Sequence, residues 1–193
     1  TNAWLRSQQT LRSLSDRLQT GRLHSGVSTV YFAGSLGRME QTAGSDADLI
    51  IIVDDAIDPR SELAREVRDS VWREVVAVGL PPPKATGVYA EVDTAARLSD
   101  RQTRGVIDED MGVFGRRFQM LLDSQPVYRV GAFSDLQRSV LQRYALGDSD
   151  NDWAYLLNDL VRYFRSLCVR TQWIDDPAEW RVINTKLRHS RLM

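Results

Sequence analysis

Two aspartates separated by one residue have the clearest potential for chemistry in this sequence. Asp46 and Asp48 come directly before the apolar run 49–53, which is bounded by acidic residues, as expected of a buried strand. Residues two apart on a strand point to the same side, with Cα atoms about 6.5–7 Å apart. Hard divalent cations, Mg²⁺ above all, prefer paired oxygen ligands of this kind. The spacing therefore predicts a metal site at the start of this strand.

A glycine–serine pair lies a short distance before the aspartates. The stretch 27–33 is rich in β-branched and aromatic residues, which predicts a strand that stops at Gly34. Gly34 allows close approach of the backbone to a ligand, and Ser35 adds a hydroxyl and an N–H at the start of an expected short helix or loop. These groups suit a phosphate. Arg38 follows, either as a contact to a triphosphate or as a solvated loop arginine.

Gly34–Ser35, a spacer of ten residues (36–45), Asp46-x-Asp48 and the apolar strand together resemble the nucleotidyltransferase superfamily built like DNA polymerase β. Four residues, one spacing and the strand context agree, whereas a lone Asp-x-Asp would be a weak signal. An ordinary surface turn with two capping aspartates is the alternative. The resemblance implies transfer of a nucleotidyl group from an NTP, such as ATP, to an acceptor, with release of pyrophosphate. Two Mg²⁺ ions, or Mn²⁺ in their place, would be bound by the aspartates and a third carboxylate.

The third carboxylate is sought on a later strand, where the resembled family usually has one. The alternating run 88–93 predicts such a strand, with Tyr89, Glu91 and Asp93 on one face. Glu91 lies between apolar residues and is the candidate catalytic and metal-binding residue, while Asp93 is held in reserve. A solvent-facing acidic side of an edge strand is the competing interpretation.

Length and composition narrow the class of protein. The chain has 193 residues, 25 of them basic and 26 acidic, and this balance gives no sign of a general nucleic-acid binder. Cys168 is the single cysteine, so no intrachain disulfide can form, which fits a reducing compartment. No apolar run approaches the roughly 20 residues of a membrane span. We therefore expect a cytoplasmic protein with no membrane partner.

Periodic apolar patterns predict helices over most of the remaining sequence. The expected helices cover about 2–18, 59–78, 114–125, 136–147 and 152–173, with a last one after 177. A weak pattern over 98–115, interrupted by glycines, predicts a connector. The expected fold class is α+β: a minimal nucleotidyltransferase α/β domain with a short mixed sheet at residues 1–99, followed by an all-helical domain at 100–193 that closes the nucleotide cleft.

The C-terminal third supplies candidate cations for the nucleotide phosphates. Segments 158–165 and 184–191 look like those of bacterial nucleotidyltransferase-domain proteins that carry a C-terminal helical domain. Arg162 and Arg165 lie on a polar stripe apart from the apolar stripe of their helix, and Lys186 is one of only two lysines. These three side chains are predicted to bind phosphate oxygens. Structural ion pairing, for example of Arg162 with Asp159, is the alternative.

Several functions remain consistent with these residues. The acceptor of the nucleotidyl group is open among a protein, an RNA such as tRNA, and a small-molecule hydroxyl, and a toxin-like enzyme that modifies tRNA ends or a protein hydroxyl would differ only in its acceptor. The rival class is a catalytically weak or inactive NTP-binding sensor or partner protein. The weak motif for the third carboxylate is its best support.

Overall fold

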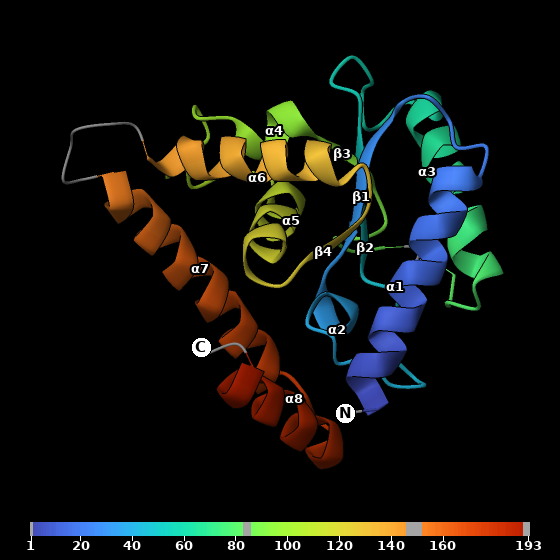
Figure 1. Cartoon of the computed structure of the whole chain (residues 1–193). Helices are drawn as coiled ribbons and strands as arrows, with labels where there is room; N and C mark the ends of the chain where they lie inside the picture. Colours follow the sequence, from blue (N-terminus) through green and yellow to red (C-terminus); the bar gives the residue numbers. More distant parts are fainter. Residues whose placement is uncertain (1, 83–85, 146–151, 191–193) are drawn as a thin grey trace. The chain divides into compact units, whose positions relative to one another are not determined.

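The computed structural model describes residues 2–82, 86–145 and 152–190. These form two compact units, one within residues 1–145 and the other within residues 146–193. Figure 1 shows the sheet and most of the helices in the first unit and a helical pair in the second.

The first unit is built on a four-stranded mixed sheet. Its strands lie in the order β3-β2-β1-β4, with β2 and β3 parallel and the other pairs antiparallel. The elements are α1 (Asn2–Thr20), β1 (Val27–Phe32), α2 (Gly34–Gly37), β2 (Leu49–Val53), α3 (Glu62–Ala77), β3 (Asp93–Thr94), α4 (Ala95–Ser99), α5 (Met111–Leu122), β4 (Gln125–Tyr128) and α6 (Val130–Tyr144). The predicted α+β class with a short mixed sheet is confirmed.

Helices cover both faces of the sheet, and this explains the composition of its central strand. β2 has the sequence Leu-Ile-Ile-Ile-Val and is buried along its whole length. Leu49, Ile51 and Val53 join the core formed with α1 and α3, and these helices lie on one side of the sheet in Figure 1. A strand buried on both faces needs a continuous apolar run rather than alternation.

The opposite face of the sheet packs on the helices that follow β3. The ring of Tyr31, from β1, lies 5.1 Å from that of Phe133, from α6. Complete burial raises the pKa of the Tyr31 hydroxyl well above its ordinary value. The Tyr31 hydroxyl is therefore a polar group inside a largely apolar layer.

Strand β4 was not expected, because only helices were predicted after residue 99. Its residues pair antiparallel with β1, with Val30 opposite Tyr128 and Phe32 opposite Gln125. The Gln125-Pro126 pair, which we interpreted as the end of a helix, begins this edge strand, where a proline is tolerated because one side makes no ladder bonds. The compact unit consequently extends to Ala145, beyond the boundary placed at residue 99.

The predicted strand over 88–93 is wrong for most of its length. Only Asp93 and Thr94 pair with β2, opposite Ile52 and Val53, and the residues before them form bends and turns. Gly87 has a φ of 101°, and its carbonyl accepts a hydrogen bond from the Ala90 N–H. The alternating sequence therefore imitates a strand in a segment that turns instead.

A buried ionic cluster joins the loop after α4 to α5 and α6. Glu109 Oε1 lies 2.5 Å from Arg117 Nη2 and 3.4 Å from Arg143 Nη2, and all three side chains are almost completely buried. Arg117 also donates through Nε to the Leu98 carbonyl at 2.7 Å. A buried carboxylate needs such partners because desolvation of an isolated charge is costly.

The second unit contains two helices, α7 (Asp152–Gln172) and α8 (Pro177–Ser190). Asp159 is buried, and its Oδ1 lies 3.1 Å from Arg162 Nη1 one turn later on α7. The structural ion pair that we considered for Arg162 is therefore present. In the part of the chain that the structure describes, no helix has the length and apolar character to cross a membrane.

Candidate functional site

The turn after β1 and the loop before β2 lie against each other. Gly34 adopts a φ of 62°, which favours glycine, and a Cβ at this position would lie 2.1 Å from Asp48 Oδ2. The backbone reinforces the contact, because the Ala33 N–H donates to the Asp48 carbonyl oxygen at 2.8 Å. The structure thus brings the predicted phosphate-binding turn and the second aspartate into direct contact.

Asp46 and Asp48 line the same small pocket, as their spacing predicts. Its other lining residues are Ala47, Trp72 of α3, Pro81, Pro82 and Tyr89. Asp46 is exposed and Asp48 is partly buried. The Trp72 Nε1 is buried and has no hydrogen-bond partner among the residues described. Its indole N–H is therefore a hydrogen-bond donor without an acceptor beside this pocket.

Arg38 is held by two carboxylates rather than extended into solvent. Its Nε lies 3.0 Å from Glu40 Oε2, and its Nη1 lies 2.5 Å from Asp123 Oδ2 at the end of α5. Burial lowers the pKa of Arg38, but the hydrogen bond to Glu40 and the charge of Asp123 outweigh it and raise the pKa overall. The backbone is also close here, since a Cβ on Gly37 would lie 1.9 Å from the Asp123 carbonyl oxygen. Arg38 therefore anchors the turn, and its contact to a triphosphate stays a prediction.

The two candidates for the third carboxylate have very different surroundings. Asp93 is completely buried, with Oδ2 2.9 Å from Arg116 Nε and Oδ1 3.0 Å from Arg97 Nη1. Glu91 is exposed and lines a separate pocket beside α3. Asp93 is thus committed to ion pairs, and Glu91 stays the candidate that a ligand can reach.

Asp46, Asp48 and Gly34 suit the divalent cation that the resemblance implies. The Asp46 and Asp48 carboxylates line one pocket, and the glycine beside them leaves the space that a side chain would fill. Oxygen ligands of this kind fit Mg²⁺, which is usually bound by one or two carboxylates while substrate phosphates supply further ligands. Within the described ranges, no group of three acidic, histidine or cysteine side chains is close enough to hold a metal ion. The site therefore fits an ion that arrives with a nucleotide.

The predicted phosphate-binding residues of the C-terminal helices belong to the second unit. Arg162 is partly buried and paired with Asp159, whereas Arg165 is exposed on the same helix. The side chain of Lys186 lies outside the described part of the structure. Their contact with a nucleotide stays a prediction.

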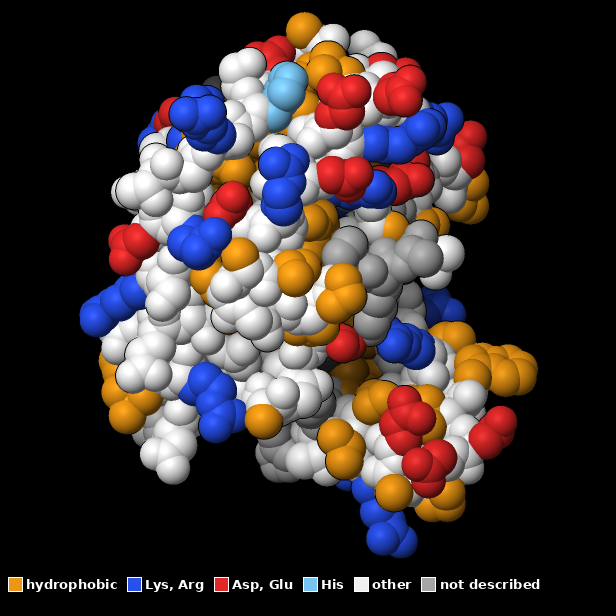
Figure 2. Space-filling view, turned by 90° about the vertical axis from the view of Figure 1, so that its right-hand side faces the viewer, with side chains coloured by type: hydrophobic (Ala, Val, Ile, Leu, Met, Phe, Trp, Pro, Cys, Tyr) orange, Lys and Arg blue, Asp and Glu red, His pale blue; other side chains and the backbone are white. Residues whose placement is uncertain are grey.

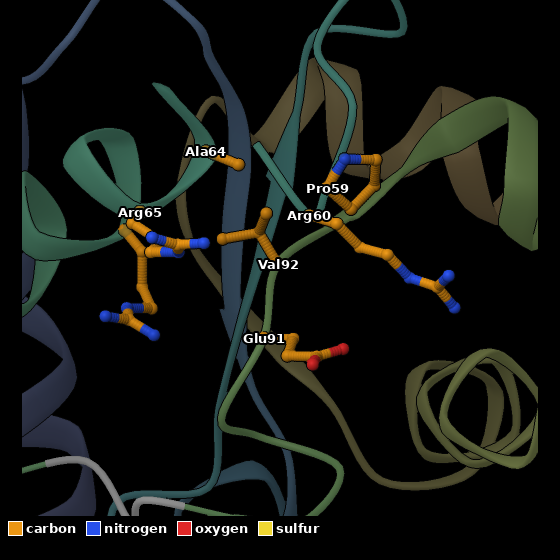
Figure 3. Close-up of a pocket in the computed structure, with 7 residues that line it drawn as sticks. Pro59, Arg60, Ala64, Arg65, Glu91 and Val92 are labelled. Carbon is orange, nitrogen blue, oxygen red and sulfur yellow. The ribbon is translucent and has the colours of Figure 1, made fainter. Parts of the chain in front are cut away.

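A set of arginines beside Glu91 was not predicted from the sequence. Figure 3 shows this pocket, which is lined by Pro59, Arg60, Ala64, Arg65, Arg68, Glu91 and Val92. The arginines lie at or near the start of α3, where the segment reads Pro-Arg-Ser-Glu-Leu-Ala-Arg-Glu-Val-Arg. The arginines do not stand out in the sequence because acidic residues lie between them. A segment of such mixed charge looks like an ordinary solvent-exposed helix face.

Comparison with known families bears on this part of the chain. Residues 7–99 match the model of a family described as "Putative nucleotidyltransferase DUF294". The matched region runs from α1 to the end of α4, so it includes Gly34, Ser35, Asp46, Asp48 and Glu91. The match supports a nucleotidyltransferase family and a general role in nucleotidyl transfer. No curated protein and no solved structure matches the chain.

Proposed function

We propose that this protein is a metal-dependent nucleotidyltransferase that moves an NMP group from an NTP to an acceptor hydroxyl and releases pyrophosphate. One observation carries the proposal. Gly34, at the predicted phosphate-binding turn, lies so close to Asp48 that a Cβ would collide with the carboxylate. The chemistry needs a phosphate-binding backbone and a metal-binding carboxylate side by side, and the family match over residues 7–99 points to the same reaction.

The proposed roles follow from the positions of the side chains. Gly34 and Ser35 bind the β- and γ-phosphates through the backbone N–H groups and the serine hydroxyl. Asp46 and Asp48 would hold the divalent cations that accompany the nucleotide. Bound there, the cations would supply positive charge for the leaving pyrophosphate and a lower pKa for the attacking hydroxyl. Asp123 keeps the turn in place through Arg38.

Glu91 is the proposed third carboxylate. It is the exposed member of the candidate pair, whereas Asp93 is engaged with Arg97 and Arg116. Because Glu91 lines a different pocket from Asp46 and Asp48, its proposed role is to accept a proton from the acceptor hydroxyl. In the helical unit, the proposed phosphate-binding residues are those indicated by the sequence: Arg162, Arg165 and Lys186.

The engagement of Asp93 also favours a second candidate function. Because this carboxylate is locked in ion pairs, a protein with only Asp46 and Asp48 at the metal site could bind NTP without rapid turnover. Such a sensor would bind Mg–NTP and release no pyrophosphate with any acceptor.

Labelling in a lysate, combined with calorimetry, tests the two functions. The chain and its Asp48→Asn variant are each incubated with cell lysate and each α-³²P-labelled NTP, and titration with Mg–NTP is carried out in parallel. If the protein is an enzyme, we expect a labelled species with the wild type but not with Asp48→Asn, and we expect release of pyrophosphate. Saturable Mg–NTP binding without any label supports the sensor. Failure to bind any NTP would contradict both.

A further inference from the structure

Tyr89 lines the pocket of the aspartates and has no role in the proposed function. Besides the carboxylates of Asp46 and Asp48, this pocket is lined by Ala47 and by four side chains that present apolar surface: Trp72, Pro81, Pro82 and Tyr89. Its volume is about 20 Å³, which exceeds the roughly 10–15 Å³ that one water molecule needs. The pocket therefore has room for one hydroxyl group beside the carboxylates.

Asp48 stands between this pocket and the predicted phosphate-binding turn. A Cβ on Gly34 would lie 2.1 Å from Asp48 Oδ2, whereas Gly34 and Ser35 are not among the described residues that line the pocket. The strand that leads to the turn, β1, and the strand that follows Tyr89, β3, flank β2 on opposite sides. The attacking and leaving oxygens of a phosphoryl transfer lie roughly in line. If pyrophosphate leaves at the turn, the acceptor approaches from the pocket.

Two arginines from different helices hold the segment that carries Tyr89. Arg116 of α5 donates through Nη1 to the Val88 carbonyl at 2.6 Å, and Arg68 of α3 donates through Nη1 to the Ala90 carbonyl at 3.1 Å. These carbonyls belong to the residues on either side of Tyr89. The segment forms turns and bends, so hydrogen bonds of a strand ladder do not fix it. Charge-assisted hydrogen bonds, which are stronger than neutral ones, hold it instead.

The two arginines are themselves held by carboxylates. Arg116 Nε lies 2.9 Å from Oδ2 of the buried Asp93, and Arg68 Nη2 lies 2.9 Å from Asp69 Oδ1. Each guanidinium therefore joins a carboxylate to a carbonyl beside Tyr89. This arrangement restricts the backbone on both sides of Tyr89 and keeps its side chain at the pocket.

We propose that the pocket receives the hydroxyl end of the acceptor, that Tyr89 contacts the acceptor and determines its class, and that Arg68 and Arg116 are positioning residues for Tyr89. The acceptor oxygen forms a bond to the α-phosphorus while the bond from this phosphorus to the bridging oxygen breaks. Pyrophosphate leaves with that electron pair, and Glu91, the base proposed above, takes the hydroxyl proton. The inference rests on the proposed function and deepens it by assigning the acceptor site.

An uncharged acceptor with apolar surface beside its hydroxyl fits this pocket better than a phosphorylated molecule or a nucleic acid does. Among the described residues, none that lines the pocket is Lys or Arg, and the two carboxylates repel anions. Figure 2 shows acidic and basic side chains interspersed on the face turned to the viewer, among the side chains described there. Nucleic-acid binding instead depends on an extended basic surface. The aromatic and proline side chains suit packing against a ring.

Transfer to p-cresol, with 4-hydroxybenzoate as its anionic counterpart, tests the acceptor class. The full chain is incubated with Mg²⁺, each α-³²P-labelled NTP and one of the two phenols, and the NMP ester and pyrophosphate are measured. We expect saturable formation of the ester with p-cresol. 4-Hydroxybenzoate should react about tenfold less efficiently, because the aspartates repel its carboxylate. Saturation-transfer NMR measures the binding of both phenols without nucleotide.

Variants of Tyr89 and Arg68 test the assigned roles. Tyr89→Ala should raise the KM for p-cresol about tenfold, the scale of a lost aromatic contact, whereas Tyr89→Phe keeps the ring and should stay near the wild type. Arg68→Gln should raise the same KM, and Arg68→Lys, which keeps a cationic donor, should restore most of the loss. Arg65→Gln is the matched control on α3, because the Arg65 side chain has no hydrogen-bond partner in the described ranges, and it should leave the KM unchanged.

Three outcomes would overturn the inference: p-cresol that neither binds nor reacts although Mg–NTP binds, 4-hydroxybenzoate that reacts as well as p-cresol, or equal rises in KM in Arg68→Gln and Arg65→Gln. Calorimetric titration with Mg–NTP separates these outcomes from failure of the proposed function. If Mg–NTP binds and a lysate acceptor is labelled while p-cresol is inert, the proposed function stands and the assigned acceptor site is wrong. If no NTP binds, the proposed function fails, and the acceptor site fails with it.

Discussion

The carboxylates of this protein divide into two groups with opposite environments. Asp46 and Asp48 line a small pocket just before β2, whereas Asp93 and Glu109 are buried, each between two arginines. α5 supplies one arginine to each buried carboxylate, Arg116 to Asp93 and Arg117 to Glu109. The comparison shows that α5 commits two acids to the fold by placing an arginine against each of them, whereas the loop before β2 places Asp46 and Asp48 in the wall of a pocket.

The largest expected effect is the loss of transfer rate on substitution of Asp48, which lines the small pocket with Asp46. Asp48→Asn should lower the rate of nucleotidyl transfer by about three orders of magnitude or more, because loss of a metal ligand forfeits several kcal/mol of transition-state stabilisation. The melting temperature without Mg²⁺ should hold or rise, since one of two neighbouring like charges is removed. Transfer assays beside thermal melts measure both quantities. A transfer rate near that of the wild type would show that Asp48 is not a metal ligand.

Substitution of the buried carboxylate Glu109 should lower stability. Glu109→Gln leaves Arg117 and Arg143 buried with a neutral partner, so we expect a loss of about 3–5 kcal/mol in the free energy of unfolding. Asp135→Asn, in the exposed pair with Arg138, is the matched control and should cost no more than about 0.5 kcal/mol. Denaturant titration distinguishes them. Equal losses would show that the buried cluster is no more important than a surface pair.

Glu91 and Asp93 sharpen the comparison because they are two residues apart. Glu91→Gln should reduce the rate by about 10²-fold, the scale of a general base, with an unchanged melting temperature. Asp93→Asn should mainly lower stability, because Arg97 and Arg116 lose a charged partner. Measuring the rate and the free energy of unfolding of both variants separates these roles. A small change of rate in Glu91→Gln would move the third carboxylate elsewhere or favour the sensor.

The smallest expected effect is that of substituting Gly34, which lies against Asp48. Gly34→Ala should cost about 1–2 kcal/mol for the left-handed backbone and should weaken Mg–NTP binding by displacing Asp48. Gly44→Ala, where a Cβ would meet no atom within 4 Å, is the control and should change neither quantity appreciably. Thermal melts and calorimetry check this pair. Unchanged Mg–NTP binding in Gly34→Ala would show that the contact with Asp48 has no role in binding.

The sequence indicated that Gly34 and Asp48 are neighbours because this part of the fold is local. The two residues are fourteen positions apart and flank β1 and β2, whose apolar patterns are strong. Their roles in binding stay predictions. β1, β2, α1 and α3 were expected within a few residues of their observed bounds for the same reason. The family match covers this region.

The buried group could not be predicted, because each of its carboxylates takes one partner from a distant segment. Arg116 pairs with Asp93 and Arg143 with Glu109 across 23 and 34 positions, and no local pattern specifies such partners. The same limit applies to β4, a four-residue edge strand containing a proline, whose place in the sheet depends on pairing with β1 almost a hundred positions earlier. Arg60 and Arg65 were missed because mixed charge on α3 resembled a solvated face.

The position of β4 has a consequence for any attempt to isolate the region that matches the family. A polypeptide shortened to residues 1–99 would contain Gly34, Asp48 and Glu91 but would lack the strand that hydrogen-bonds to the outer side of β1. The N–H and C=O groups that β1 shares with Gln125–Tyr128 would then be open to pairing with another polypeptide, and such exposed edges promote self-association. We therefore expect the shortened polypeptide to aggregate, whereas one that ends at Ala145 keeps this edge covered.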